Sequence, residues 1–245
     1  MDRAHFYATM NGEGTLDYER YLNTKALLSC QKEFTEFCNG DELQFQIVHQ
    51  VEELWMKLIG YTLLDIDDYL QQENTNRVVT LFRRVHTALQ LMVSQLALLE
   101  TMSPREYQEI RLKLGNGSGQ ESPGYRTLLK MSAPLWQSFK THYLDAHGLT
   151  IEKIYNTEYN HGDAYVVAEA MAEFDELFQR FRYCHVQLIQ RTIGLHSKSL
   201  KGRPVDRLKE GGWATFFPEL WEIRSQMTDT WGSQYGVVRD SLSAH

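Results

Sequence analysis

Cysteine is scarce in this 245-residue chain, which contains only Cys30, Cys38 and Cys184. No CxxC pair is present, and three cysteines cannot form a complete disulfide framework. This usage indicates a reducing compartment, so we expect a cytoplasmic protein. The chain also lacks an apolar run long enough to cross a bilayer, and residues 1–20 lack the apolar stretch of a signal peptide. We therefore expect no membrane partner.

Positive charge is also in the minority, with 25 lysines and arginines against 32 acidic residues and a net charge of -7. A general nucleic-acid or membrane-surface binder needs a basic face, so this balance argues against both classes. Hydrophobic residues make up 42% of the chain and charged residues 23%, which suits a folded core and excludes wholesale disorder. We expect one domain over residues 1–245.

No strand-like alternation, repeat or low-complexity tract is present, and helical periodicity dominates. We expect an all-α fold, a single-domain bundle of helices packed side by side. Proline at position 134 should kink or break the fourth helix, and residues 145–162 should be irregular. The helices are expected at about 41–72, 76–100, 103–114, 122–134, 163–193 and 218–226, with a polar loop over 196–212.

Two of these helices have a long apolar face with steps of three and four residues. In the first helix the face comprises Leu43, Ile47, Val51, Leu54, Leu58, Tyr61 and Leu64, with Phe45, His49 and Met56 on its flank. In the second it comprises Val78, Phe82, Val85, Leu89, Met92, Leu96 and Leu99.

His185 belongs to a similar stripe on the helix expected at 163–193, and so should point to the interior. The stripe comprises Met171, Phe174, Phe178, Phe181, His185, Leu188 and Thr192. A neutral imidazole in an apolar pocket suits an axial ligand of haem iron. A hydrogen-bonded core histidine is the alternative, and periodicity by itself favours that alternative.

Two further groups could line a site. Phe45 and His49 are one helical turn apart and can form one cavity wall, although a satisfied, partly buried histidine is the alternative for His49. Tyr107 and Arg111 also lie one turn apart, and the arginine fork suits a carboxylate. Ser118 lies in the glycine-rich loop that follows and could close over a small ligand. An exposed helix with an ordinary turn is the alternative.

Competing catalytic motifs are weak or missing. Glu158 and His161 form a lone ExxH, whereas a di-iron bundle needs two such motifs and two more glutamates. The sequence contains no HExxH, CxxCH, GxSxG, P-loop or GxGxxG pattern. A haem would therefore be bound non-covalently.

Five segments together resemble the tryptophan 2,3-dioxygenase superfamily. The first segment, Asp17–Leu22 with Leu27–Gln31, resembles the N-terminal motif of the family. The others are Asp41–Lys57 around His49, Leu99–Arg111 with Tyr107, Phe181–His185 with Ile193–Gly194, and Thr215–Leu220. One such motif would be weak, but five in the family's order form a specific resemblance.

The resemblance implies a homotetramer that binds haem b and O2 and oxidises an L-tryptophan-like substrate. It implies His185 as the proximal ligand and His49 as the distal base or indole N–H acceptor. Arg111 would pair with the substrate carboxylate, Tyr107 would position it, and Phe45 would pack near the indole. Residues 1–35 would form an arm whose Tyr18, Tyr21 and Leu22 reach a neighbouring subunit's site.

Two departures from the family pattern bear on the product. The stretch between Tyr125 and the His185 helix is short, and Ser199–Arg203 stands where family members have a glycine-rich closing loop. Ser199 could replace the loop's threonine hydroxyl. This variant loop resembles the branch that makes 2-oxindoles from tryptophan or β-methyltryptophan, so we favour monooxygenation. An ordinary dioxygenase giving N-formylkynurenine, a non-catalytic haem-binding sensor and a helical interaction protein without a cofactor are the alternatives.

Overall fold

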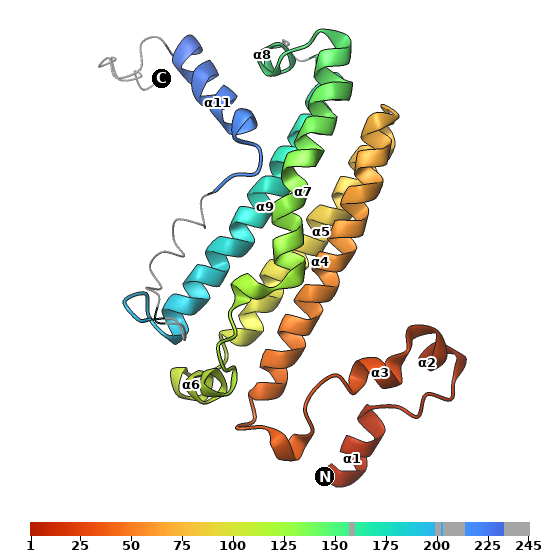
Figure 1. Cartoon of the computed structure of the whole chain (residues 1–245), viewed down its shortest axis with the longest axis vertical. Coiled ribbons are helices and arrows are strands. Elements are labelled where there is room, and N and C mark those ends of the chain that lie inside the picture. The colour runs from red at the N-terminus through yellow and green to blue at the C-terminus, as the bar shows by residue number, and fades with distance from the viewer. Residues whose placement is uncertain (157–159, 199–201, 203–213, 233–245) are drawn as a thin grey trace, which may run out of the picture.

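The computed structural model of the chain describes residues 1–156, 160–198, 202 and 214–232. Four long helices lie side by side (Figure 1): α4 (Glu42–Gln71), α5 (Thr75–Leu99), α7 (Pro123–Phe139) and α9 (Asp163–Thr192). In this view α4 and α7 run upward, and α5 and α9 run downward. No β-strand occurs among the described residues, which confirms the all-α expectation.

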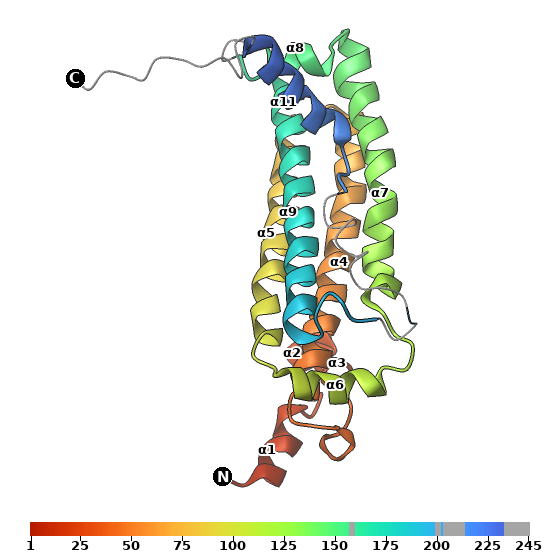
Figure 2. The ribbon, with the colours of Figure 1, turned by 90° about the vertical axis from the view of Figure 1, so that its left-hand side faces the viewer.

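Shorter elements cover the two ends of the bundle (Figure 2). At the lower end are α1 (Arg3–Met10), α2 (Asp17–Leu22), α3 (Thr24–Leu28), η1 (Phe34–Glu36), α6 (Pro104–Lys113) and η2 (Gly119–Glu121). At the upper end are η3 (Lys140–Leu144), η4 (Asp145–His147), α8 (Ile151–Tyr155) and α11 (Pro218–Trp231).

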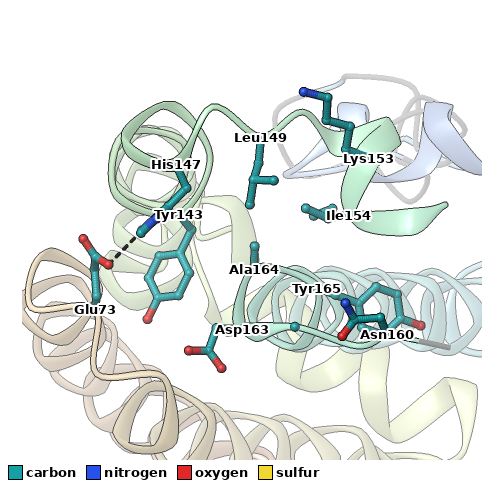
Figure 3. Close-up of a pocket in the computed structure, with 11 residues that line it drawn as sticks. Glu73, Tyr143, His147, Leu149, Lys153, Ile154, Asn160, Asp163, Ala164 and Tyr165 are labelled. Atoms are coloured by element: carbon teal, nitrogen blue, oxygen red, sulfur yellow. Dashed lines mark hydrogen bonds and ion pairs between the residues drawn. The ribbon is translucent and has the colours of Figure 1, made fainter. Parts of the chain in front are cut away.

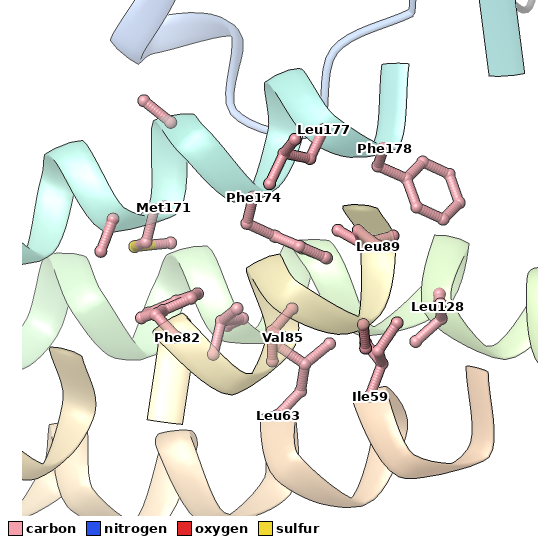
Figure 4. Packing of buried hydrophobic residues seen from close by; sticks show 14 of the residues in the cluster. Ile59, Leu63, Phe82, Val85, Leu89, Leu128, Met171, Phe174, Leu177 and Phe178 are labelled. Carbon is pink, nitrogen blue, oxygen red and sulfur yellow. The ribbon is translucent and has the colours of Figure 1, made fainter. Parts of the chain in front are cut away.

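The apolar faces expected on the second and fifth long segments form the core (Figure 4). Phe82 and Leu89 of α5 and Phe174 and Phe178 of α9 are fully buried. The helices bury these side chains because removing apolar area from water is the main favourable term in folding. The interior-facing stripe that carries His185 is thus confirmed as a core face.

The apolar face expected on α4 is not the one that faces the core. Val48, Met56, Ile59, Leu63, Ile66 and Leu70 are buried, so the flank with Phe45, His49 and Met56 is the interior side. Most of the expected face is exposed: Ile47, Leu54, Leu58, Tyr61 and Leu64 are 39–66% accessible. This helix is apolar on two sides, and periodicity does not tell which side meets the bundle.

The chain path departs from two other expectations: the helix does not break at Pro134, and residues 145–162 are not wholly irregular. α7 continues through Pro134 to Phe139. Proline costs a helix one backbone hydrogen bond, but both Pro134 and Lys130, whose carbonyl loses its donor, are exposed to water. Residues 145–162 also contain η4 and α8, with Thr150 capping α8 by accepting from the Lys153 N–H. α6 begins with a side-chain cap, because Ser103 accepts from the Glu106 N–H.

The N-terminal arm has no buried residue in α1, α2, α3 or η1. It touches the bundle near the start of α4, where Gln31 donates to Gln50 and Lys32 pairs with Glu42. Tyr18 and Tyr21 are 71% and 89% exposed. The chain alone therefore gives this arm little apolar burial.

A buried carboxylate attaches the C-terminal segment to α9. Asp175 is 0% exposed, and its Oδ2 accepts hydrogen bonds from the Phe216 and Phe217 N–H groups and from Trp221 Nε1. These bonds hold Phe216 and Phe217 against Phe174, with ring centroids 5.3 and 6.3 Å away. The side chains fill the space between α7 and α9, whose backbones have almost no close contact.

Replacing Asp175 with alanine should lower the free energy of unfolding by about 3 kcal/mol, because three buried donors lose a charged acceptor. Urea denaturation measures this change. The matched control is Glu176→Ala, which removes only the exposed i,i+4 pair with Arg180 and should cost no more than about 0.5 kcal/mol. Equal effects of the two substitutions would contradict this role for Asp175.

Candidate active site

The fold brings His49 of α4 and His185 of α9 to the lower end of the bundle. Burial lowers the pKa of His185 to about 4, and the neighbouring His49 imidazole contributes to this shift. Burial also lowers the pKa of His49. Both side chains are consequently neutral imidazoles near pH 7, the form that binds metals and accepts protons.

Hydrogen bonding determines which nitrogen of His49 carries the proton. His49 Nδ1 lies 2.7 Å from the Phe45 carbonyl oxygen, which can only accept, so Nδ1 must be the protonated nitrogen. The lone pair is then on Nε2, and that atom has no hydrogen bond within the described part of the chain. This geometry leaves Nε2 available to accept an N–H from a ligand.

His185 differs from the hydrogen-bonded core histidine that was its alternative. Among the described residues it makes no hydrogen bond, and its only ring contact is the edge of Phe181 at 6.1 Å. Gly119 of η2 lies against it: a Cβ at that position would be 3.9 Å from His185 Nε2. A partly buried, neutral imidazole without a hydrogen-bond partner is the donor type that haem iron takes.

Aromatic rings and an arginine surround the histidines. Phe45 lies 4.2 Å from His49 and 6.2 Å from Tyr107, measured between ring centroids. Burial raises the pKa of Tyr107, while the positive charge of Arg111 acts in the opposite direction. Arg111 Nη2 donates to the Lys198 carbonyl at 2.5 Å, so the fork is turned toward the segment after α9.

Ser118 lies in the same region, but its side chain bonds to the backbone: it caps η2 by accepting from the Gln120 N–H. The structure thus gathers Phe45, His49, Tyr107, Arg111, Ser118 and His185 around one end of the bundle. Tyr18, Tyr21 and Leu22 are on the exposed arm and are not part of this group. Ser199 lies outside the described residues, as does Glu158 of the lone ExxH, whose His161 stacks on Tyr165.

Glu53 links α4 to the start of α7 and is not among the site residues expected from the sequence. Its Oε2 accepts from the Gly124 N–H at 3.0 Å, and a Cβ at Gly124 would lie 2.6 Å from Met56 Cβ. Only glycine allows this close approach. The contact fixes the N-terminus of α7, where Tyr125 stacks on Phe178 of α9.

Glu52 is a second residue that sequence reasoning missed. It is 4% exposed, and its Oε1 has no hydrogen-bond partner among the described residues. Burial raises the pKa of Glu52 to about 7, and the nearby Gln95 amide offsets only part of this shift. A buried acid one helical turn from His49 could have been noticed only by knowing which side of α4 faces inward.

A separate cavity of about 370 Å³ lies at the other end of the bundle (Figure 3). Its lining includes the His147–Glu73 ion pair, Lys153 and Asp163. None of the site residues expected from the sequence lines this cavity. We assign no function to it.

These features define an all-α bundle protein with a pair of neutral histidines at one end. Its sequence matches the family model of tryptophan 2,3-dioxygenase over residues 3–133, more than half of the chain. The chain therefore belongs to the tryptophan 2,3-dioxygenase family. His49, Tyr107, Arg111 and Ser118 lie within the matched range, and His185 lies beyond it.

Full-length relatives extend the match. The chain is 29% identical to tryptophan 2,3-dioxygenases from Serratia proteamaculans, Myxococcus xanthus and Herpetosiphon aurantiacus. These alignments cover 86–88% of this chain and 91–98% of the relatives. Among the described residues, no helix is both long and apolar enough to span a membrane.

The raised pKa of Glu52 predicts a pH effect on stability. Between pH 4.5 and 7 the folded protein holds this proton more firmly than the unfolded chain, so stability falls as pH rises through that window. The shift corresponds to a loss of about 3 kcal/mol above pH 7. Glu52→Gln cannot ionise and should avoid this loss.

Urea unfolding at pH 4.5 and pH 8 measures the difference. From pH 4.5 to pH 8 the free energy of unfolding of Glu52→Gln should rise by about 3 kcal/mol relative to that of the wild type. The control is Glu100→Gln, at the exposed C-cap of α5, which should show the same pH dependence as the wild type. A variant whose stability follows the wild type at both pH values would show that Glu52 titrates normally.

Proposed function

We propose that the chain is a haem-dependent oxygenase that uses O2 to oxidise the indole C2 and C3 of L-tryptophan or a close derivative such as β-methyltryptophan. The observation that carries the proposal is the partly buried pair of neutral imidazoles: among the described residues His185 has no hydrogen bond, and His49 has a free acceptor nitrogen. The names of the relatives support the substrate class.

The residues around His185 fit haem b. The imidazole is neutral and unpartnered, Phe181 supplies an apolar wall, and Gly119 brings no side chain. A ligand on Nε2 would displace residues 115–121, and Gly115, Gly117 and Gly119 give that segment the conformational freedom to move. Bound there, haem would supply the iron that binds and activates O2.

The protein's own groups would hold the substrate. His49 Nε2 would accept the indole N–H, which positions the ring and could take up its proton. Phe45 would pack on the indole, and Arg111 would exchange the Lys198 carbonyl for the substrate carboxylate, beside Tyr107. Ser118 and Ser199 would close over the substrate's polar end.

For assembly, we propose a cytoplasmic homotetramer in which the arm of residues 1–35 reaches a neighbouring subunit. The exposed Tyr18, Tyr21 and Leu22 would complete that subunit's site. The absence of buried residues from α1, α2 and α3 supports this assignment, because such an arm gains its apolar burial elsewhere.

His185→Ala should remove most of the haem, since an iron porphyrin loses its one covalent bond to the protein. The ratio of Soret to protein absorbance after reconstitution gives the occupancy. His161→Ala, a histidine at the other end of the bundle, should retain haem fully. Normal occupancy and an unchanged spectrum in His185→Ala would refute the ligand assignment.

Arg111→Leu should retain haem and weaken tryptophan binding by on the order of 2–5 kcal/mol, because a buried carboxylate loses its charged partner. Titration followed in the haem spectrum measures both. Arg105→Leu, in the same helix but 87% exposed, is the control and should bind normally. If tryptamine, which lacks the carboxylate, binds the wild type as tightly as tryptophan does, Arg111 has another role.

The product distinguishes two oxygenase outcomes. We favour a 2-oxindole, because the segment Ser199–Arg203 replaces a glycine-rich loop and should close less completely. Insertion of one oxygen atom sends the other to water and needs two electrons and two protons from an added reductant. The relatives' names favour the alternative, N-formylkynurenine, which retains both oxygen atoms and needs no net reductant.

Mass spectrometry of the product formed under ¹⁸O2 separates these outcomes. We expect one labelled atom and turnover that depends on reductant. Two labelled atoms without added reductant would establish an ordinary dioxygenase, and no product with either tryptophan or β-methyltryptophan would contradict the proposed activity.

A further inference from the structure

The exposed side of the α4–α5 hairpin carries two rows of apolar side chains, which together we name the hairpin face. On α4 it comprises Ile47, Leu54, Leu58 and Tyr61, at steps of seven, four and three residues. On α5 it comprises Leu91 and Leu98, one heptad apart, and Ile47 and Leu98 line one shallow hollow. These six large apolar side chains are 39–66% exposed and are aligned along two adjacent helices, an arrangement typical of an interaction surface.

Apart from Lys57, one turn from both Leu54 and Tyr61, charged residues occupy the hairpin face only near the α4–α5 turn. Asp65 and Asp68 continue the α4 stripe, and Arg84 and Arg77 continue the α5 stripe at the same heptad spacing. All four are exposed, and none forms an ion pair within the described part of the chain. Asp68 lies in the last turn of α4 and Arg77 in the first turn of α5. Each charge has the same sign as the partial charge at that helix end, so its interaction with its own helix dipole is unfavourable. Arg77 stacks on the Tyr69 ring of α4, 5.6 Å from guanidinium carbon to ring centroid, but Asp65, Asp68 and Arg84 have no partner among the described residues.

We infer that the hairpin face packs against the same face of a second copy, with the two copies parallel. A two-fold axis along the helices places α4 over the partner's α5. Leucines then meet leucines at the lower end, and the acidic residues of α4 meet the arginines of the partner's α5 at the turn end. An antiparallel pair would instead lay Ile47 and Leu98 on aspartates and arginines, which costs desolvation without pairing.

This orientation has a consequence for the site. Parallel copies put both lower ends of the bundle side by side. Each lower end contains the His49–His185 pair and the point where the N-terminal arm joins α4. The arm of one copy then begins beside the site of the other. The inference rests on the self-association proposed above and adds the surface and the orientation.

The first test is the oligomeric state, measured by analytical ultracentrifugation. Leu54→Lys with Leu58→Lys should raise the dissociation constant across this face by at least ~100-fold, because each change is repeated in the partner. Leu129→Lys, at an exposed leucine of α7 (38% accessible, against 39% for Leu58), is the matched control and should leave assembly unchanged. Haem content after reconstitution should stay normal in both variants and shows that they are folded.

The second test measures orientation by pulsed EPR with a spin label at Ile47→Cys or at Asp68→Cys, after Cys30, Cys38 and Cys184 are replaced by serine. In a parallel pair both self-distances are short and similar. In an antiparallel pair each would be longer by about 30 Å, because 21 helical residues separate the positions.

A monomeric wild type would overturn the inference together with the proposed assembly. An oligomer insensitive to Leu54→Lys with Leu58→Lys, or one with long self-distances, would overturn the inference alone. An intact oligomer that incorporates no ¹⁸O into the product would contradict only the proposed reaction.

Discussion

Phe174, Phe178 and Phe181 occupy successive turns of α9 and are buried; Phe174 contacts Phe82 of α5, and Phe178 contacts Phe216 of the C-terminal segment. His185 follows one turn later on the same face. Burial of this face therefore sets the rotation of α9 in the bundle, and that rotation also directs the imidazole to the interior. The stability of the core and the position of the candidate ligand depend on the same apolar stripe.

Asp175 allows the adjacent side of α9 to be buried as well. A carboxylate without partners would be costly there, but three N–H donors from the C-terminal segment compensate for its desolvation. Phe216 and Phe217 consequently occupy the gap between α7 and α9 in the upper part of the bundle. Arg182, stacked on Phe178 and Phe216, lies at the lower end of this filled region, one turn before His185.

Sequence periodicity predicted the helices α5 and α9 and their buried faces because each has a single apolar side. It failed for α4, where a second apolar side faces outward and only the neighbouring helices decide which side is buried. It failed at Pro134 because an exposed proline leaves its unpaired carbonyl to water. The contacts of Glu52 and Glu53 depend on packing between helices, which one sequence pattern does not contain.

The candidate site was predictable residue by residue only because the motifs resemble a known family. Helical spacing placed His185 inward but could not separate an iron ligand from a satisfied core histidine. In the structure His185 has no hydrogen bond among the described residues, and His49 is fixed in one tautomer by the Phe45 carbonyl, which supports the proposed roles. The closing loop at Ser199 remains a sequence-based prediction.

The resonance Raman spectrum of the ferrous, haem-reconstituted protein tests the central claim most directly. The account predicts an iron–imidazole stretching band that shifts when the histidines carry ¹⁵N and is missing from His185→Ala supplied with the same haem. A band that persists in His185→Ala, or that disappears only when another histidine is replaced, would contradict the assignment of His185 as the iron ligand.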